Sequence, residues 1–308
     1  SDRDRWAYQH LFMEGFSLGA PPDYFSVNGQ AWGFPVLDPA KMFNADGTLA
    51  DGGKFLKAIF DKTFAENPGG VRIDHIVGLI DPWVYPSSKK STQSQHGGTR
   101  LYSSPEHPDL GKFSRVDAAE VDYQQDAAST ERVHTVSPQS LKRYSELIQL
   151  IMQSARDQGL DPDEALICED LGTLTEPVKA VMKDLNLSGI RVTQFVDVNN
   201  PTHLYRGKNV APQHWVMVGS HDNQSILEWV DEKFKRNDVS GHARILAEDL
   251  IPDDRAHDRP CYEQVLKQDP LALLKAKLAE VFASPAKNIQ IFFTDLFGIK
   301  ATYNKPGT

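Results

Sequence analysis

Charged side chains follow three short apolar runs of this chain, and their types suit acid–base chemistry. The three clusters are Arg72, Asp74 and His75 within 71–80, Glu169 and Asp170 after 165–168, and His221 and Asp222 after 215–220. No glycine-rich phosphate loop and no His/Cys cluster at metal-ligand spacing accompanies them. Cleavage of a glycosidic bond needs one carboxyl that protonates the leaving oxygen and a second that acts at the anomeric carbon. The clusters therefore indicate acetal chemistry.

The surroundings of each carboxyl predict a different role for it. Arg72 and Asp74 lie two residues apart and share one face of a strand, so the cation favours the ionised carboxylate that a nucleophile requires. Glu169 follows Leu-Ile-Cys without a neighbouring cation, and apolar surroundings raise a carboxyl pKa, as a general acid requires. Asp222 beside His221 is expected to hold substrate hydroxyls. Taken alone, the Arg72–Asp74 pair fits a buried ion pair between neighbouring strands equally well.

Hydrophobic periodicity predicts an alternation of helices and apolar strands. Helices are expected at 53–66, 139–158, 224–236 and 240–249, after an N-cap at Thr175 and after Asp269-Pro270, and strands at 71–80, 165–170, 190–195, 215–223 and 288–293. The inner face of the last helix is expected to consist of Leu271, Leu274, Leu278 and Phe282. This alternation is typical of a parallel α/β protein. Because polar residues at several strand ends converge in a (β/α)8 (TIM) barrel, that is the fold we expect.

Two stretches of the chain show no sustained period. Residues 19–35 combine turn residues with Tyr24, Trp32 and other aromatic side chains, which indicates a stacking platform for sugar rings, with Gln30 as a hydrogen-bonding partner. A small core beneath a loop is the alternative. Residues 81–138 are rich in Pro, Gly, Ser and Thr, so either a lid or binding insertion or a disordered surface loop is expected there.

Composition and charge exclude several classes of function. The 308 residues are 40% hydrophobic and 24% charged, with a net charge of −9 and a pI near 5.6. Such an acidic protein is not expected to bind nucleic acid or an anionic membrane. No apolar run of membrane-spanning length and no signal peptide is evident, so a cytoplasmic location is expected. Cys168 and Cys261 lie far apart and predict neither a disulfide nor a metal site, and no cofactor is expected.

Five motifs taken together resemble those of the 4-α-glucanotransferases, the amylomaltases or disproportionating enzymes of glycoside hydrolase family 77. They are GAPPDYFSVNGQAWGFP, VRIDHIVGLI, ICEDLG, VGSHDN and YNKPGT, in this order over nearly the whole chain. The resemblance implies that Asp74 is the nucleophile, Glu169 the acid/base and Asp222 the transition-state stabiliser. It assigns substrate contacts to eight further residues: Asp4 and Trp6, which match an Asp-x-Trp pattern of the family, Tyr24, Gln30, Trp32, Arg72, His75 and His221.

By the same resemblance, residues 1–308 are expected to be the catalytic (β/α)8 barrel domain, with an insertion at about 84–140. No counterpart of the family's first barrel strands precedes Ser1, so we expect the numbering to begin inside a longer protein. The implied ligands are α-1,4-glucans and maltooligosaccharides, and the implied reaction is transfer to a 4-hydroxyl acceptor. An α-amylase-like hydrolase and a catalytically silent glucan-binding protein are the alternatives.

Overall fold

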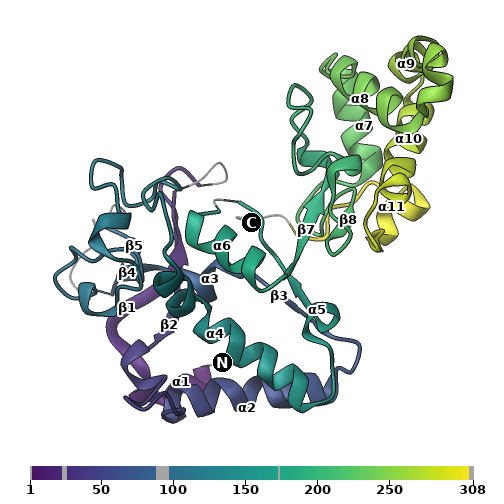
Figure 1. Cartoon of the computed structure of the whole chain (residues 1–308). Coiled ribbons are helices and arrows are strands. Elements are labelled where there is room, and N and C mark those ends of the chain that lie inside the picture. Colours follow the sequence, from purple (N-terminus) through teal and green to yellow (C-terminus); the bar gives the residue numbers. More distant parts are fainter. Residues whose placement is uncertain (1, 23–25, 88–96, 173, 305–308) are drawn as a thin grey trace. The chain divides into compact units, whose positions relative to one another are not determined.

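The computed structural model describes residues 2–22, 26–87, 97–172 and 174–304. The chain forms two compact units, Ser1–Leu187 and Ser188–Thr308 (Figure 1). Both contain parallel strands together with helices, so the expected mixed α/β class is confirmed. The parallel strands in the described ranges form no closed barrel, and the (β/α)8 fold therefore stays a prediction. None of the described helices combines the length and the apolarity that crossing a membrane requires.

Part of the first unit is an antiparallel sheet that hydrophobic periodicity did not predict. Its strands are β1 (Phe12–Ala20), β2 (Gln30–Leu37), β4 (Trp83–Pro86) and β5 (Thr99–Arg100), in the order β2-β1-β4-β5. The described part of 19–35 is largely strand, so the expected loop conformation is wrong there. A Cβ atom at Gly19 would lie 2.1 Å from the Gln30 carbonyl oxygen, so the two strands approach closely only because this position is glycine.

The parallel strands of the first unit are β3 (Val71–Ile73) and β6 (Leu166–Cys168). The strand expected over 71–80 ends at Ile73, and α3 (Val77–Ile80) follows, so that prediction is wrong in its second half. Ile76 and Ile80 are both completely buried. A short segment whose apolar side chains are mostly buried cannot be assigned to strand or helix by its period.

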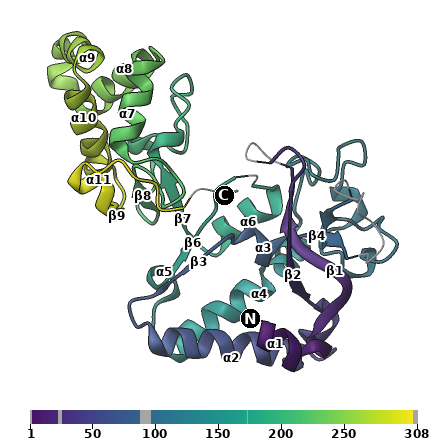
Figure 2. The same ribbon diagram turned by 180° about the vertical axis from the view of Figure 1, so that it is seen from behind.

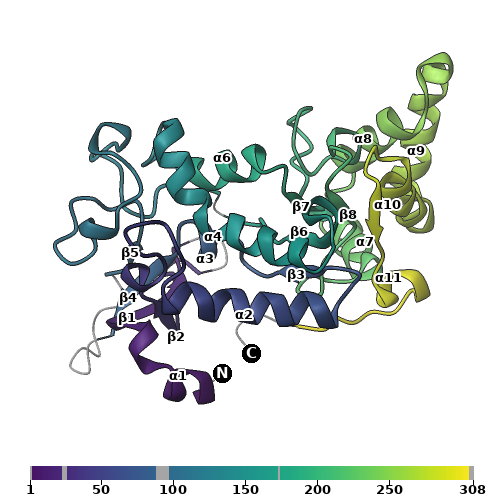
Figure 3. The ribbon, with the colours of Figure 1, turned by 60° about the horizontal axis from the view of Figure 1, so that its bottom comes forward.

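The longer helices of the first unit follow the predicted periodicity. The helices of this unit besides α3 are α1 (Asp2–Ala7), α2 (Asp51–Glu66), α4 (Pro138–Asp157), α5 (Pro162–Ala165) and α6 (Glu176–Asp184). Helices α2 and α4 lie side by side (Figure 3), and Lys57 on α2 donates to Asp157 on α4 at 2.6 Å. Thr175 is the N-cap of α6 as expected, although its hydroxyl makes no capping hydrogen bond.

The described residues of 81–138 pack into the core of the first unit, so the disordered-loop alternative is wrong for them. Besides β4 and β5 they form two short 3-10 turns, η3 (Gly111–Phe113) and η4 (Ala118–Glu120). Seven apolar side chains anchor the described part of the segment in the core: Val84, Leu101, Tyr102, Leu110, Val116, Val121 and Val133. The Arg115 guanidinium stacks over the Tyr102 ring at 3.8 Å. The polar composition of 81–138 gave no indication that the segment contributes to the core, because arginine side chains also pack there.

The second unit is built on three parallel strands. They are β7 (Ser188–Val192), β8 (Trp215–Met217) and β9 (Asn288–Gln290), in that order. The helices and 3-10 turns are η5 (Thr193–Phe195), η6 (Gly207–Asn209), α7 (Ile226–Lys235), α8 (Ser240–Leu250), η7 (Asp253–Asp258), α9 (Arg259–Gln268), α10 (Pro270–Ala283) and α11 (Phe293–Phe297). Helices α8, α9 and α10 pack against one another (Figure 2). The three strands confirm the first parts of the strands predicted over 190–195, 215–223 and 288–293, whose second parts are not strand. Helices α7, α8 and α10 confirm predicted helices, whereas α9 and α11 correspond to no predicted helix.

Helix α10 buries a different face from the predicted one. Its buried residues are Leu273, Ala276, Lys277, Glu280 and Val281. Leu271 and Phe282, which were expected inside, are both more than half exposed, and Leu274 and Leu278 are partly buried. Periodicity of large apolar side chains could not identify this face, because a lysine and a glutamate lie within it. Their side chains form an enclosed ion pair with 2.7 Å between Nζ and Oε2.

Candidate active site

The β3–β6 ladder becomes irregular where the two candidate carboxyls lie. The Glu169 N–H donates to the Ile73 carbonyl at 2.9 Å, as a parallel ladder requires. The Glu169 carbonyl then accepts from the Ile76 N–H at 3.0 Å, where a regular ladder would use His75. The His75 N–H donates instead to Glu169 Oε2 at 2.9 Å, and His75 has a φ of 49°, which is uncommon for a residue with a Cβ atom. The His75 main chain, which follows β3, therefore binds the Glu169 side chain, which follows β6.

Asp74 is the more exposed of the two carboxyls. Its Oδ1 lies 2.6 Å from Arg72 Nη2, and its side chain is 75% exposed, against 38% for Arg72. The prediction that Arg72 and Asp74 lie together is confirmed, and the alternative of a buried ion pair is wrong. A carboxylate that solvent reaches beside a cation is accessible for attack on a substrate carbon.

Glu169 lies in a different environment. Burial raises the pKa of its carboxyl above the ordinary value, while hydrogen bonds from the Leu171 N–H, at 2.6 Å to Oε1, and the His75 N–H lower it by less. The Asp74 charge raises this pKa further, and Arg72 lowers it. Each carboxyl oxygen has a second lone pair, so the two N–H donors orient the group and still allow it to carry a proton. A raised pKa suits a group that delivers a proton near neutral pH.

Trp32 and Gln30 lie beside the same strand end. The Trp32 ring meets the His75 ring edge-on, with centroids 5.1 Å apart and planes at 82°. Its Nε1–H donates to Gln30 Oε1 at 3.2 Å. Trp32 and Phe34 are both exposed, so the alternative of a small core beneath a loop is wrong for them. Tyr24 lies outside the described residues, and its contact with substrate stays a prediction.

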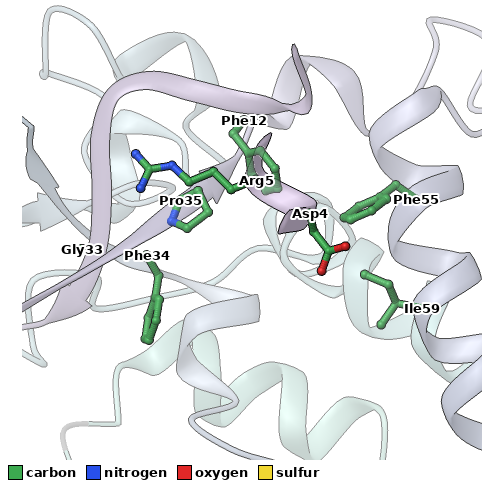
Figure 4. A pocket seen from close by; sticks show the side chains of 8 residues that line it. All are labelled: Asp4, Arg5, Phe12, Gly33, Phe34, Pro35, Phe55 and Ile59. Carbon is green, nitrogen blue, oxygen red and sulfur yellow. The ribbon is translucent and has the colours of Figure 1, made fainter. Parts of the chain in front are cut away.

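Asp4 and Trp6 lie on α1. Asp4, but not Trp6, lines a pocket of about 250 Å³. The lining residues are Asp4, Arg5, Phe12, Gly33, Phe34, Pro35, Phe55 and Ile59 (Figure 4). Figure 4 shows the Asp4 carboxylate beside Phe55 and Ile59 of α2. The Trp6 side chain is 76% exposed. A carboxylate among aromatic rings can bind one hydroxylated ring by stacking and hydrogen bonding.

In the second unit, His221 and Asp222 follow β8, as the sequence predicts. The Asn304 side-chain amide donates to Asp222 Oδ1 at 2.5 Å, and the Asn304 N–H donates to the His221 carbonyl at 3.0 Å. His221 Nε2 lies 3.5 Å from the same Asp222 oxygen. Asn304 was not among the predicted site residues, although it stands in the motif YNKPGT. That motif was the signal from which its role could have been predicted.

The turn that carries Asp222 is fixed by its neighbours. Ser220 donates to Asn223 Oδ1 at 2.8 Å through both its N–H and its hydroxyl. The Gln194 side-chain amide donates to the Gln224 carbonyl at 3.0 Å. A Cβ atom at Gly219 would lie 3.1 Å from that amide nitrogen, so Gln194 packs directly against the turn. Gln194 is a second residue of this site that sequence analysis did not single out.

The described residues divide the predicted site between the two units. Six of its members lie near the strand ends of the first unit: Gln30, Trp32, Arg72, Asp74, His75 and Glu169. Asp222 and His221 belong to the second unit. No group of three or more His, Cys, Asp and Glu side chains in the described part of the chain is arranged to hold a metal ion. An accessible carboxylate next to a carboxyl of raised pKa can provide both attack and proton transfer at one acetal.

The sequence matches the family model described as 4-alpha-glucanotransferase over residues 2–308. The chain belongs to this family, glycoside hydrolase family 77. The chloroplastic/amyloplastic 4-alpha-glucanotransferase of Solanum tuberosum is 28% identical over 239 residues, which cover 74% of this chain and 31% of the relative. The 4-alpha-glucanotransferase of Synechocystis is 26% identical over 221 residues, covering 70% and 32%. The chain thus spans about a third of the length of these curated relatives.

Two solved structures have a fold similar to that of this chain. The amylomaltase from Corynebacterium glutamicum superposes with a TM-score of 0.65 at 21% identity, covering 99% of this chain and 38% of that chain. The amylomaltase from Streptococcus agalactiae, solved in complex with acarbose, gives 0.61 at 17% identity, covering 99% and 48%. At these identities the likeness concerns the fold.

Proposed function

We propose that this chain carries the catalytic groups of a 4-α-glucanotransferase, which transfers a segment of an α-1,4-glucan to the 4-hydroxyl of glucose or a maltooligosaccharide. The observation that carries the proposal is the contrast between two neighbouring carboxyls. Asp74 is open to solvent beside Arg72, whereas Glu169 is partly buried with a raised pKa. Two carboxyls whose environments differ in this way take the two roles of a retaining mechanism. Membership of the family supports the same reaction.

In the first step, an Asp74 oxygen bonds to the anomeric carbon of the donor glucan while the bond from that carbon to the departing 4-oxygen breaks. Glu169 gives its proton to the departing oxygen. Retention requires carboxyls about 5–5.5 Å apart, and neighbouring strands of a sheet are about 4.8 Å apart. Ile73 and Cys168 are paired in the β3–β6 ladder, and Asp74 and Glu169 directly follow them. The register therefore favours a direct displacement over one that needs a water molecule between the carboxyls.

In the second step, Glu169 accepts the proton of the acceptor 4-hydroxyl, whose oxygen bonds to the anomeric carbon as the bond to Asp74 breaks. Asp222 binds substrate hydroxyls with His221 and stabilises the charge that develops on the sugar ring. Arg72 and His221 contribute to binding at the cleaved sugar, and His75 was predicted from the resemblance to contact the substrate. The remaining predicted contacts, which are with the acceptor or with the donor chain, are assigned to Asp4, Trp6, Tyr24, Gln30 and Trp32.

Several broader features belong to the same proposal. The catalytic domain is a (β/α)8 barrel of which residues 1–308 form part, with an insertion at about 84–140. Family likeness at the level of the fold supports the barrel. The ligands are α-1,4-glucans and maltooligosaccharides, and the site of action is the cytoplasm. Transfer in preference to hydrolysis requires acceptor platforms that exclude water, and the exposed Trp32 beside His75 is suited to form one.

Incubation with maltotriose tests the proposal, with products separated by chromatography. A transferase gives glucose together with maltopentaose and longer chains, and these products disappear in Asp74→Asn. Glucose and maltose alone would identify an α-amylase-like hydrolase instead. Binding of maltotriose without any turnover would identify a glucan-binding protein and would contradict the proposed activity.

A further inference from the structure

We infer that His75 is a positioning residue whose main chain, held in a left-handed conformation by its ring, orients Glu169 for proton transfer. Sequence analysis placed the imidazole itself on the substrate. The inference rests on the proposed function, because it concerns the acid/base role of Glu169.

The main-chain geometry at His75 is built around the Glu169 carboxyl. With a φ of 49°, His75 shifts the β3–β6 ladder by one residue, so that the Ile76 N–H donates to the Glu169 carbonyl at 3.0 Å. The His75 N–H is thereby released for the Glu169 side chain, at 2.9 Å from Oε2. Together with the Leu171 N–H on Oε1 at 2.6 Å, it fixes both carboxyl oxygens. Strained conformations of this kind persist where surrounding contacts maintain them.

Two contacts that described residues make with the imidazole help to maintain this conformation. Trp32 meets the ring edge-on at 5.1 Å between centroids, and the indole is itself tied to Gln30 by a hydrogen bond of 3.2 Å. On α3, a Cβ atom at Gly78 would lie 3.2 Å from His75 Cδ2, so the helix packs closely against the ring. The Gly78 N–H also donates to the His75 carbonyl at 2.8 Å. The imidazole therefore acts as a packing element between β2 and α3.

The arrangement links an exposed aromatic side chain to the proton-transfer group. Trp32, which is 37% exposed, contacts the ring whose backbone orients Glu169. An acceptor sugar that stacks on Trp32 would stabilise the His75 conformation and with it the position of the carboxyl. Among the described residues, the charged groups that shift the pKa of Glu169 are Asp74 and Arg72, and both remain in every variant proposed below.

Four substitutions at position 75 of the 308-residue chain test the inference: His75→Gly, His75→Asn, His75→Ala and His75→Val. All four lack the imidazole, so direct substrate contacts by the ring cancel in the comparison. Gly and Asn adopt a positive φ readily, whereas Ala and especially Val do not. The measurements are kcat and KM for maltotriose disproportionation between pH 4 and pH 9, with circular dichroism to confirm folding.

The inference predicts that kcat follows the ease of the left-handed conformation. The kcat of His75→Val should be about tenfold below that of His75→Gly, with KM nearly equal. The alkaline limb of kcat/KM should move to higher pH in His75→Val, because losing a donor to the ionised carboxylate raises its pKa. If His75→Val does not fold, the Gly and Ala variants make the same comparison.

Equal losses in all four variants, concentrated in KM, would show that the imidazole binds substrate and would overturn the inference. An unchanged pH profile across the series would overturn it as well. Glu169→Gln separates this failure from failure of the proposed function. If that variant retains parental kcat, the proposed acid/base role is wrong; if it loses kcat while the position-75 series is flat, only the positioning role is wrong.

Discussion

Two ion pairs in this molecule resemble one another in sequence and differ in their surroundings. Arg72 and Asp74 lie at the end of β3, and the Asp74 carboxylate is 75% exposed. Lys277 and Glu280 lie on α10 and are 0% and 1% exposed. Lys277 Nζ donates to the Thr193 carbonyl at 2.8 Å as well as to Glu280, and Glu280 Oε1 accepts from the Gly207 N–H at 3.0 Å.

The difference in burial separates a candidate catalytic pair from a pair that links parts of the structure. Lys277 and Glu280, the enclosed pair, form hydrogen bonds with main-chain groups of η5 and η6. These bonds join α10 to the two turns that follow β7. The open pair leaves a carboxylate accessible at a strand end, next to the Glu169 carboxyl of raised pKa. Sequence spacing alone did not distinguish these cases, because both are a cation and a carboxylate two or three residues apart. Burial and the number of partners distinguish them.

The largest effect is expected on activity from Asp74→Asn. Loss of the proposed nucleophile should lower kcat about 10⁴-fold or more. The free energy of unfolding should change by less than about 1 kcal/mol, because an exposed ion pair contributes little to stability. Kinetics on maltotriose and urea unfolding of the same preparation measure both quantities. A large loss of stability with modest loss of activity would assign this pair to structure.

The next largest effect is expected on stability from Lys277→Met. The substitution leaves Glu280 buried without its cation, so the free energy of unfolding should fall by about 3–5 kcal/mol. The matched control is Lys300→Met, since Lys300 and its partner Asp231 are each about half exposed, and that variant should change stability by about 1 kcal/mol or less. The double variant Lys277→Met/Glu280→Gln should recover part of the loss. Equal unfolding midpoints for Lys277→Met and the control would contradict the structural role.

A smaller effect is expected from the histidine packed beside the enclosed pair. The pKa of His242 is lowered to about 3, chiefly by burial and to a smaller extent by the charges of Lys277 and Lys233, against which Asp238 acts. The unfolded chain takes up this proton near pH ~6.5, so stability is complete above that pH and is lost as the pH falls. At pH 5 the loss from this group is about 2 kcal/mol.

Replacing His242 by Phe isolates that contribution. The variant preserves an aromatic partner for Trp229, whose ring lies 4.9 Å from the imidazole, and removes the titrating group. Unfolding of the parent and His242→Phe at pH 7 and pH 5 should show a pH dependence that is smaller by about 2 kcal/mol in the variant. His214, whose pKa burial lowers to about 4, is present in both proteins and does not affect the difference. Identical pH dependence would contradict the role given to His242.

Much of the fold could be predicted where one face of an element is apolar. Helices α2 and α4 were predicted within a few residues because their buried side chains recur at helical spacing. The β1–β2 pair was not predicted, because the glycines that permit its close approach also indicate turns. The face of α10 was predicted wrongly, because its buried residues include a lysine and a glutamate.

The part of the candidate site that depends on the register of β3 and β6 could be predicted from the sequence. Carboxyls after two parallel strands lie side by side, which is why Asp74 and Glu169 could be paired from sequence. The left-handed turn at His75 could not be predicted, because its φ depends on the packing of Trp32 and Gly78 around the ring. The hydrogen bond from Asn304 to Asp222 joins residues 82 positions apart, which no local pattern reports.

The division of labour between Asp74 and Glu169 is the central claim, and trapping the covalent intermediate tests it most directly. The Glu169→Gln variant is incubated with α-maltosyl fluoride, whose leaving group departs without a proton, so the first step proceeds while the second, which needs a base, stalls. Denaturation, proteolysis and mass spectrometry then locate the sugar. We expect one maltosyl group on Asp74, absent when Asp74→Asn is added. A maltosyl group on another residue, or release of fluoride unchanged by Asp74→Asn, would contradict it.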